Sequence, residues 1–283
     1  MVTDIQSSSA MCWSEYAPLK RVILCPPQYL RIDAPINHVQ TRYFEDGIDN
    51  QLAMAQHQEL VNTLRGFGID VILLKPEENY PDQVFTRDIG FTLGHHLFVS
   101  QMEENIRKGE EKILTNWLVN HYTPFQPIRS GSIEGGDVMI DRDTIWIGNS
   151  GRTSHQAMAE LQQELPQMEI LPLSVPVKYL HLDCILNILS PNEALIFPPA
   201  FEEESLALLA KRYELIEVDE TEQFTLGTNI LSIGNRTVLS LPVNPRVNKA
   251  LRHRGFTVVE VDLSEIIKSG GSFRCSTLPL LRE

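Results

Sequence analysis

Hydrophobic and polar positions alternate along this chain in one recurring order: two short apolar strands, a helix and a further strand. In the clearest case these four elements are predicted at residues 229–233, 237–241, 246–254 and 256–261. Gly234-Asn235 separates the first two strands and is a strong hairpin signal, and Gly255 ends the helix. The segment therefore forms a complete ββαβ unit.

The same order recurs in three earlier segments. Two of them are complete, with predicted elements at 185–189, 194–197, 202–211 and 215–218, and at 138–140, 144–147, 155–165 and 169–173. In the third, strands at 91–93 and 97–100 precede a helix at 103–120. Repetition of one supersecondary unit is typical of radial or solenoid architectures.

The N-terminal segment holds an incomplete unit, with a strand at 21–24, a helix at 51–64 and a strand at 71–74. The segment 275–280, near the other end of the chain, can supply the missing strand. This pairing would close a ring of five units and bring Cys275 beside the N-terminal unit. We therefore predict a single α/β domain over 1–283, in which residues at the ends of inner strands converge on one central site.

Composition narrows the classes of function. The chain carries 24 Lys and Arg against 37 Asp and Glu, a net charge of -13, which argues against a nucleic-acid or anionic-membrane surface. Residues 1–10 are polar without an apolar signal core, and no apolar stretch is long enough to span a bilayer. The four cysteines are far apart and form no CxxC pair, which indicates neither a zinc site nor a disulfide framework. A reduced, cytoplasmic location is expected.

Four short segments carry candidate chemistry, and three of them open a predicted hairpin unit. The segment Pro-Asp-Gln-Val-Phe-Thr-Arg-Asp places the carboxylates of Asp82 and Asp88 six residues apart. Glu134 precedes a Gly-Gly pair that allows close backbone approach or a positive φ. His181 and Asp183 point the same way if the backbone is extended. Each segment alone also fits an ordinary turn or a solvated surface. The prediction of a site therefore depends on the placement of all the segments together.

The fourth segment, Gly-Gly-Ser-Phe-Arg-Cys-Ser-Thr-Leu, contains Cys275. A glycine-rich loop with a basic neighbour favours a thiolate, the nucleophilic form of cysteine, although most cysteines are simply packed. Carboxylates accept bidentate hydrogen bonds from a planar guanidinium and leave its central carbon open to a thiolate. A histidine can then protonate the departing amine and activate water, while a neighbouring carboxylate orients it.

Taken together, these motifs resemble the guanidino-group-modifying superfamily, which comprises arginine deiminases, dimethylarginine dimethylaminohydrolases and amidinotransferases. The resemblance rests on FTRD, EGGD, HLD and a C-terminal Cys, in that order, and covers essentially the whole chain. It implies a five-bladed α/β-propeller of ββαβ units, the pentein fold. It also implies that Cys275 is the nucleophile, His181 the general acid and base, and Glu134 the partner of His181.

The resemblance further implies a set of substrate contacts: Asp82, Asp88, Asp183, Arg107 and Arg152. Asp88 would bind the guanidinium, and Asp82 matches a second acid of the dimethylarginine enzymes. Asp183 matches an acid that holds the guanidinium in arginine-deiminase-like members. The two arginines match residues that grip the α-carboxylate of the substrate.

The substrate is less well defined than the reaction. Chain length and Asp82 favour hydrolysis of dimethylarginine to citrulline and dimethylamine, whereas Asp183 is more typical of deiminases and transferases. Hydrolysis of free arginine, amidino transfer and a non-catalytic binding propeller are the alternatives. No cofactor and no metal are expected, a homodimer is compatible with the sequence, and Asn37 is a candidate lid residue facing the substrate. Cys275 is expected to stay a protonated thiol until a cationic substrate binds.

Overall fold

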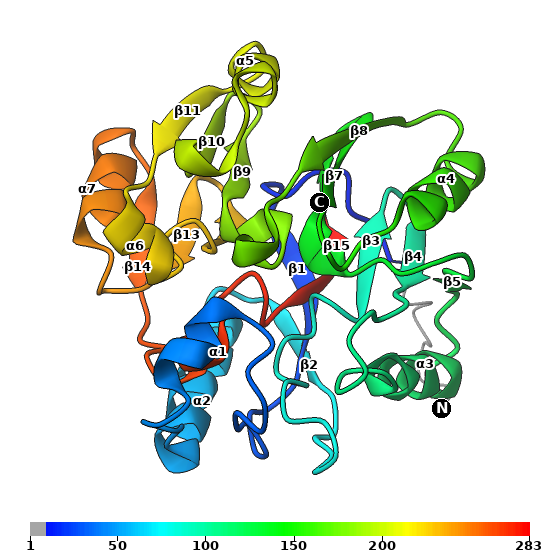
Figure 1. Cartoon of the computed structure of the whole chain (residues 1–283), viewed down its shortest axis with the longest axis vertical. Helices are drawn as coiled ribbons and strands as arrows, with labels where there is room; N and C mark the ends of the chain where they lie inside the picture. Colours follow the sequence, from blue (N-terminus) through cyan, green and yellow to red (C-terminus); the bar gives the residue numbers. More distant parts are fainter. Residues whose placement is uncertain (1–9) are drawn as a thin grey trace.

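The computed structural model describes residues 10–283 and arranges five three-stranded sheets around a common centre (Figure 1). In each sheet the central strand has one antiparallel and one parallel neighbour. The parallel pair is always connected through a helix, because parallel strands need a crossover whereas antiparallel strands need only a short turn. The ββαβ unit predicted from the sequence is therefore confirmed.

Four units are continuous in the chain. The first two consist of β3 (Gly90–Leu93), β4 (His96–Val99), α3 (Glu110–Asn120) and β5 (Gln126–Pro127), and of β6 (Val138–Asp141), β7 (Thr144–Asn149), α4 (His155–Glu164) and β8 (Glu169–Ser174). The next two consist of β9 (Leu186–Ser190), β10 (Glu193–Ile196), α5 (Glu203–Ala210) and β11 (Glu214–Glu217), and of β12 (Leu231–Gly234), β13 (Thr237–Ser240), α7 (Pro245–His253) and β14 (Thr257–Glu260). A short helix, α6 (Glu220–Phe224), connects these last two units.

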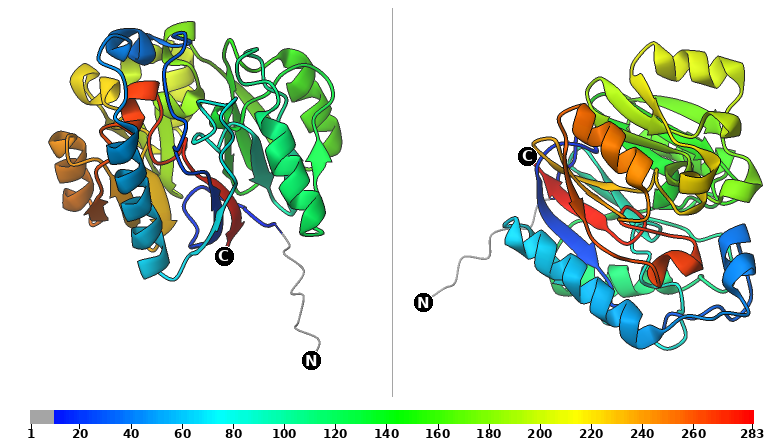
Figure 2. Two further views of the ribbon diagram at one scale, coloured as in Figure 1. Left: turned by 90° about the horizontal axis from the view of Figure 1, so that it is seen from below. Right: turned by 90° about the vertical axis from the view of Figure 1, so that its left-hand side faces the viewer.

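Segments from both ends of the chain form the fifth unit. Its elements are β1 (Leu19–Leu24), α2 (Asn50–Gly66), β2 (Asp70–Leu73) and β15 (Leu278–Arg282), with the short helix α1 (His38–Tyr43) before α2. Strand β1 pairs in parallel with β2 and in antiparallel register with β15, where Ile23 lies opposite Leu278. Figure 2 shows the red β15 beside the blue β1. The predicted closure of the ring is confirmed.

Apolar runs explain why the strands are buried and the helices lie at the outside of the ring (Figures 1 and 2). Ile145, Trp146 and Ile147 of β7 are inaccessible to solvent although they alternate between the two faces of the sheet. Burial on both faces suits a continuous apolar sequence rather than an alternating one. Leu161 of α4 covers this strand and packs in one apolar cluster with Ile145 and Ile147.

Two sequence predictions of local structure are wrong. The helix predicted at 103–120 begins only at Glu110, because the glycine before it adopts φ +110° and the preceding segment turns to bury Arg107. Cys275 was expected within the closing strand, but β15 begins at Leu278 and Cys275 lies in the turn before it. Both differences concern residues that face the centre of the ring.

Residues 1–9 of the polar N-terminal stretch lie outside the described residues. Among residues 10–283, none of the helices combines the length and the apolar character needed to cross a bilayer.

Candidate active site

Five segments that precede equivalent strands meet at the centre of the ring. Four precede the first strand of a unit, namely β3, β6, β9 and β12, and the fifth precedes β15, which takes the corresponding place in the closing unit. Four of the five segments contain residues predicted from the sequence: Asp88, Glu134, His181 with Asp183, and Cys275. Because equivalent strands deliver these groups to the same place, motifs far apart in the sequence converge.

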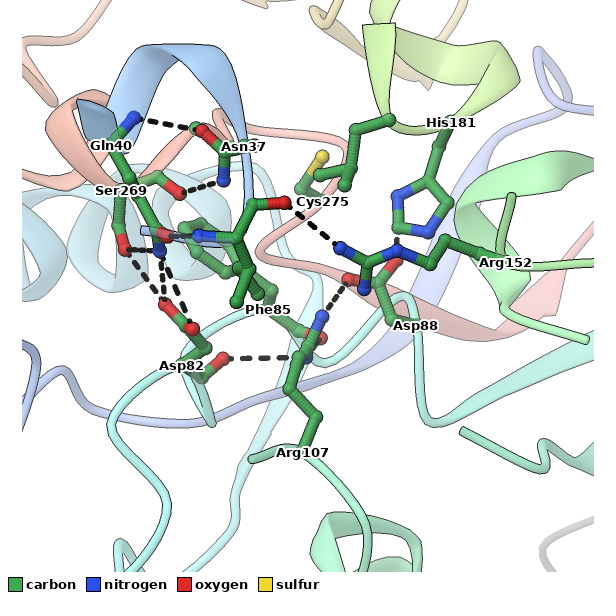
Figure 3. A pocket seen from close by; sticks show the side chains of 14 residues that line it. Asn37, Gln40, Asp82, Phe85, Asp88, Arg107, Arg152, His181, Ser269 and Cys275 are labelled. Carbon is green, nitrogen blue, oxygen red and sulfur yellow. Dashed lines mark hydrogen bonds and ion pairs between the residues drawn. The ribbon is translucent and has the colours of Figure 1, made fainter. Parts of the chain in front are cut away.

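Three of these segments, those before β3, β9 and β15, line a pocket (Figure 3). The sequence-predicted residues that line it are Asn37, Asp82, Asp88, Arg107, Arg152, His181 and Cys275. Glu134 and Asp183 lie immediately behind this lining. The first contacts His181 and the second contacts Cys275. The structure therefore brings the whole predicted set together.

His181 and Glu134 form a buried ion pair in which Nε2 lies 2.7 Å from Oε2. Burial disfavours the imidazolium, but the charge of Asp88 and the hydrogen bond to Glu134 outweigh burial and raise the pKa of His181 to about 10. Burial also favours a neutral Glu134, but the hydrogen bond with His181 holds the pKa of this acid well below its usual range. His181 is therefore a cationic proton donor at neutral pH.

The glycine pair after Glu134 makes room for this ion pair. A Cβ atom on Gly136 would lie 2.8 Å from the ring of His181 and 2.8 Å from Oδ1 of Asp88. A Cβ atom on Gly135 would collide with the backbone carbonyl of Arg87. Neither glycine has a positive φ, so of the two reasons predicted for the pair, close backbone approach is the one confirmed.

Cys275 is buried, with Sγ 3.6 Å from Oδ2 of Asp183. A hydrogen bond with Cys184, burial and the negative charge of Asp183 raise the pKa of the Cys275 thiol well above its usual range. The group is therefore a thiol at neutral pH in the free protein, which agrees in direction with the sequence prediction.

Asp183 does not face the same way as His181. Leu182–Cys184 is a 3₁₀ turn rather than extended backbone, so the alternation expected for a strand does not apply. Asp183 instead pairs with Arg274, whose Nη1 lies 3.0 Å from Oδ2. A second buried acid, Glu15, lies 3.2 Å from the same guanidinium. The charge of the arginine next to Cys275 is thus balanced by two carboxylates.

Asp88 forms an ion pair with an arginine of the protein itself. Nη1 of Arg107 lies 2.6 Å from Oδ2 of Asp88, and Nη2 lies 2.7 Å from Glu110. Burial disfavours the charge of Arg107, but these two acids raise its pKa well above the usual range. Arg107, expected to grip a substrate carboxylate, is thus held by two carboxylates of the chain.

Three buried polar atoms at the pocket have no hydrogen-bond partner within residues 10–283: Oδ1 of Asp88, Nδ1 of His181 and Nη1 of Arg152. The first two lie 3.6 Å apart. Leaving a buried polar atom unpaired is unfavourable, so these atoms mark where a polar ligand would bind. A carboxylate oxygen and a guanidinium nitrogen suit a ligand with a cationic group and an anionic group.

Asp82 lies across the pocket from Arg152 (Figure 3), and its Oδ1 accepts hydrogen bonds from Ser269 at 2.7 Å and Gln40 at 3.2 Å. Burial raises the pKa of Asp82. Asn37, the suggested lid residue, lines the pocket and donates to the carbonyl of Ser269 at 3.2 Å. Gln40 and Ser269 were missed by the sequence analysis, because neither belongs to a motif and only the folded chain brings them to Asp82.

One group of side chains at the pocket also has the composition of a metal site, since ligand atoms of Asp88, Glu134 and His181 lie within 4.8 Å of one another. However, Arg107 binds Asp88 and His181 binds Glu134, so both carboxylates already have a cationic partner. The arrangement fits an acid–base pair and a cation site better than a metal centre. The expectation that no metal takes part stays a prediction.

The family described as N,N dimethylarginine dimethylhydrolase, eukaryotic, has a sequence model that matches residues 26–282. The chain belongs to the guanidino-group-modifying superfamily. Members of this superfamily act on guanidino groups, which is the chemistry expected from the motifs.

The chain is similar to known proteins over almost its whole length. It is 48% identical to YkgA of Bacillus subtilis (strain 168), an uncharacterized protein, over 96% of this chain and 95% of that one. It is 29% identical to the N(G),N(G)-dimethylarginine dimethylaminohydrolase of Mycobacterium tuberculosis, over 92% of this chain and 86% of that enzyme. The crystal structure of the N-terminal domain of ArgZ bound to product, an arginine dihydrolase from cyanobacteria, matches with a TM-score of 0.85 at 26% identity, over 93% of this chain and 97% of that one. These matches confirm the pentein fold and indicate an enzyme that hydrolyses amidine groups.

Proposed function

We propose that this protein hydrolyses a C–N bond in the guanidino group of dimethylarginine, giving citrulline and dimethylamine. The observation that supports this most is the convergence of a buried thiol, a cationic histidine and a carboxylate with an unpaired oxygen at one pocket. Together they supply a nucleophile, a proton donor and a cation site. The match to the dimethylarginine family model supports the choice of substrate.

Substrate binding starts the reaction. The guanidinium of the substrate donates to Oδ1 of Asp88, and its positive charge favours ionisation of Cys275, whose proton leaves to solvent. The thiolate attacks the guanidinium carbon, and a C–S bond forms in a tetrahedral intermediate. A thiol that ionises only with the cation in place limits reaction with other electrophiles.

His181 then transfers protons in both halves of the reaction. The imidazolium gives its proton to the dimethylamine nitrogen as the C–N bond breaks, which leaves a thiouronium on Cys275. Neutral His181 next takes a proton from water, and the resulting hydroxide attacks the thiouronium carbon. The C–S bond breaks, citrulline leaves, and the proton left on its oxygen returns to the sulfur and restores the thiol.

Arg152 is the proposed anchor for the α-carboxylate of the substrate. Its Nη1 makes no hydrogen bond in the part of the chain that the structure describes and lies 3.8 Å from Oε2 of Glu134, and its Nη2 donates to the carbonyl of Ile36 at 3.1 Å. Arg107 is already paired with Asp88 and Glu110, so its proposed role is to orient Asp88 toward the guanidinium.

Free arginine is the second candidate substrate, and a specific observation favours it. Asp183 lies 3.6 Å from Sγ of Cys275, where its carboxylate can accept a hydrogen bond from a terminal NH₂ group but leaves little room for methyl groups. The similarity to the arginine dihydrolase domain of ArgZ supports the same choice. With arginine the leaving group is ammonia and the other steps are unchanged.

The test compares kcat/KM for dimethylarginine and arginine by citrulline formation, in the wild type and in Cys275→Ser. We expect the wild type to form citrulline and the variant to lose about a thousandfold or more in rate, because a hydroxyl is a far weaker nucleophile in this site. Cys25→Ser is the matched control, since Cys25 is buried in a cluster that does not line the pocket. Absence of citrulline with either substrate would contradict the proposal.

A further inference from the structure

The segment before β12 is the one of the five equivalent segments to which the sequence motifs assign no residue. Asn229 stands two residues before Leu231, the first residue of β12. In the sequence it reads as the start of the strand, so it was not considered as a site residue. In the structure it is fully buried and lies against Cys275.

Asn229 binds the turn that carries Cys275 at three points and the segment before β9 at a fourth. Its Oδ1 accepts from the backbone N–H of Cys275 at 3.1 Å, and its own carbonyl accepts from the N–H of Arg274 at 3.3 Å. Its Nδ2 donates to Sγ of Cys275 at 3.1 Å and to the carbonyl of Asp183 at 3.1 Å. One side chain therefore fixes both the backbone and the sulfur of this residue.

These partners leave no freedom in how the amide of Asn229 is oriented. A backbone N–H can only donate, so the atom facing Cys275 N must be oxygen. A backbone carbonyl can only accept, so the atom facing Asp183 O must be nitrogen. An N–H donor consequently points at the sulfur, whichever protonation state the sulfur adopts.

We propose that Asn229 is a positioning residue for the reaction described under Proposed function, in which its amide N–H stabilises the thiolate of Cys275 and fixes the direction of attack. A hydrogen bond to an ionised acceptor is stronger than one to its neutral form, so the donor favours the thiolate over the thiol. The effect on turnover rests on the proposed function. The effect on the thiol itself does not.

Several of the other groups that face the sulfur oppose its ionisation. Those around it are Asp88, His181, Asp183, Cys184 and Arg274. The two acids and the second thiol oppose ionisation. Arg274 is already paired with Asp183 and with Glu15. The Asn229 N–H contacts the sulfur directly and favours the thiolate, and it carries no charge that would repel a cationic substrate.

The experiment measures the rate at which iodoacetamide alkylates Cys275, followed by mass spectrometry of its peptide, between about pH 8 and 10 and without substrate. Asn229→Asp keeps the oxygen that binds Cys275 N and replaces the donor with a carboxylate oxygen. Asn187→Asp is the matched control, because Asn187 is also buried and donates to the carbonyls of Thr228 and Ile230, on either side of Asn229.

We expect Asn229→Asp to slow alkylation roughly ten- to hundredfold at each pH, and to lower kcat by a similar factor with little change in KM. Asn187→Asp should lose stability and leave the alkylation rate within about twofold of the wild type. Asn229→Ser, which keeps a shorter donor and acceptor, should give an intermediate rate and serves as the readout if the carboxylate variant does not fold.

Unchanged alkylation in the folded Asn229 variants would overturn the proposal, and so would an equal decrease in Asn187→Asp. A wild type that forms no citrulline but whose alkylation depends on Asn229 would contradict the proposed function and still support the role of Asn229.

Discussion

Single residues in the pocket act mainly through paired charges. Glu134 holds His181 as a cation, and Arg107 holds one oxygen of Asp88 while the other stays unpaired. A buried charge is tolerated when its partner is close and well aligned, and removal of one partner leaves the other uncompensated. The consequences of breaking these pairs can therefore be stated for each residue.

Glu134→Gln should shift the pH dependence of catalysis. Without the carboxylate, the hydrogen bond and the charge of Glu134 no longer stabilise the imidazolium, so the pKa of His181 falls below about 10 and less imidazolium is present at alkaline pH. We expect the alkaline limb of the kcat/KM profile to move to lower pH, with kcat reduced at least about tenfold. Glu169→Gln, at an exposed surface pair with Arg212, is the control. An alkaline limb that stays in place would show that Glu134 does not set the proton affinity of His181.

The sequence predicted the identities of the main site residues but not their partners. Asp88 and Arg107 are 19 residues apart, and Glu134 and His181 are 47 apart, so their contacts exist only in the folded chain. Asn229 was not predicted as a site residue for the same reason. Its neighbours in the chain look like a strand, and only its contact with Cys275 indicates a role.

At the scale of elements, the short segments before equivalent strands determine the geometry of the site. The Gly-Gly turn before β6 brings backbone against the ring of His181, and the 3₁₀ turn before β9 directs Asp183 away from it. These segments have few residues, so a small change in one displaces a functional group directly.

Gly136→Ala tests this coupling. The added methyl group would lie 2.8 Å from both the His181 ring and Asp88 Oδ1, so both side chains or the turn itself must shift. We expect kcat/KM to fall about ten- to hundredfold, since displacements of about 1 Å at reacting groups have effects of this size. Gly66→Ala is the control, because its Cβ would meet nothing within 4 Å at the end of α2, and stability should rise by up to about 1 kcal/mol. Equal activity in the two variants would count against the coupling.

At the scale of the whole molecule, the ring of five units follows from local pattern, which is why the sequence predicted it. Most strands are short apolar runs bounded by turn residues, and each crossover needs a helix. The start of α3 and the turn containing Cys275 were not predicted, because the contacts that fix them join residues far apart in the chain, Arg107 with Asp88 and Cys275 with Asn229. The homodimer and the cytoplasmic location stay predictions.

Acid stability should reflect a histidine far from the pocket. His57 of α2 is buried, and burial lowers its pKa to about 4. Between pH 6.5 and 4 the unfolded chain binds a proton here that the folded chain does not, so stability falls as pH falls. Urea unfolding should show the wild type losing about 2 kcal/mol more than His57→Gln between pH 7 and 5. Replacement of the exposed His155 should not change this slope, and a wild type with the same slope as His57→Gln would contradict the assignment.

The central claim is that Cys275 forms a covalent bond to the guanidino carbon, and mass spectrometry of acid-quenched enzyme tests it most directly. Loss of dimethylamine from dimethylarginine and loss of ammonia from arginine leave the same thiouronium on the sulfur. We therefore predict one adduct mass on the Cys275 peptide with whichever substrate turns over, and none in Cys275→Ser. A smaller adduct that lacks the amino-acid chain would mean amidino transfer, and citrulline formation with no adduct on Cys275 would contradict the account.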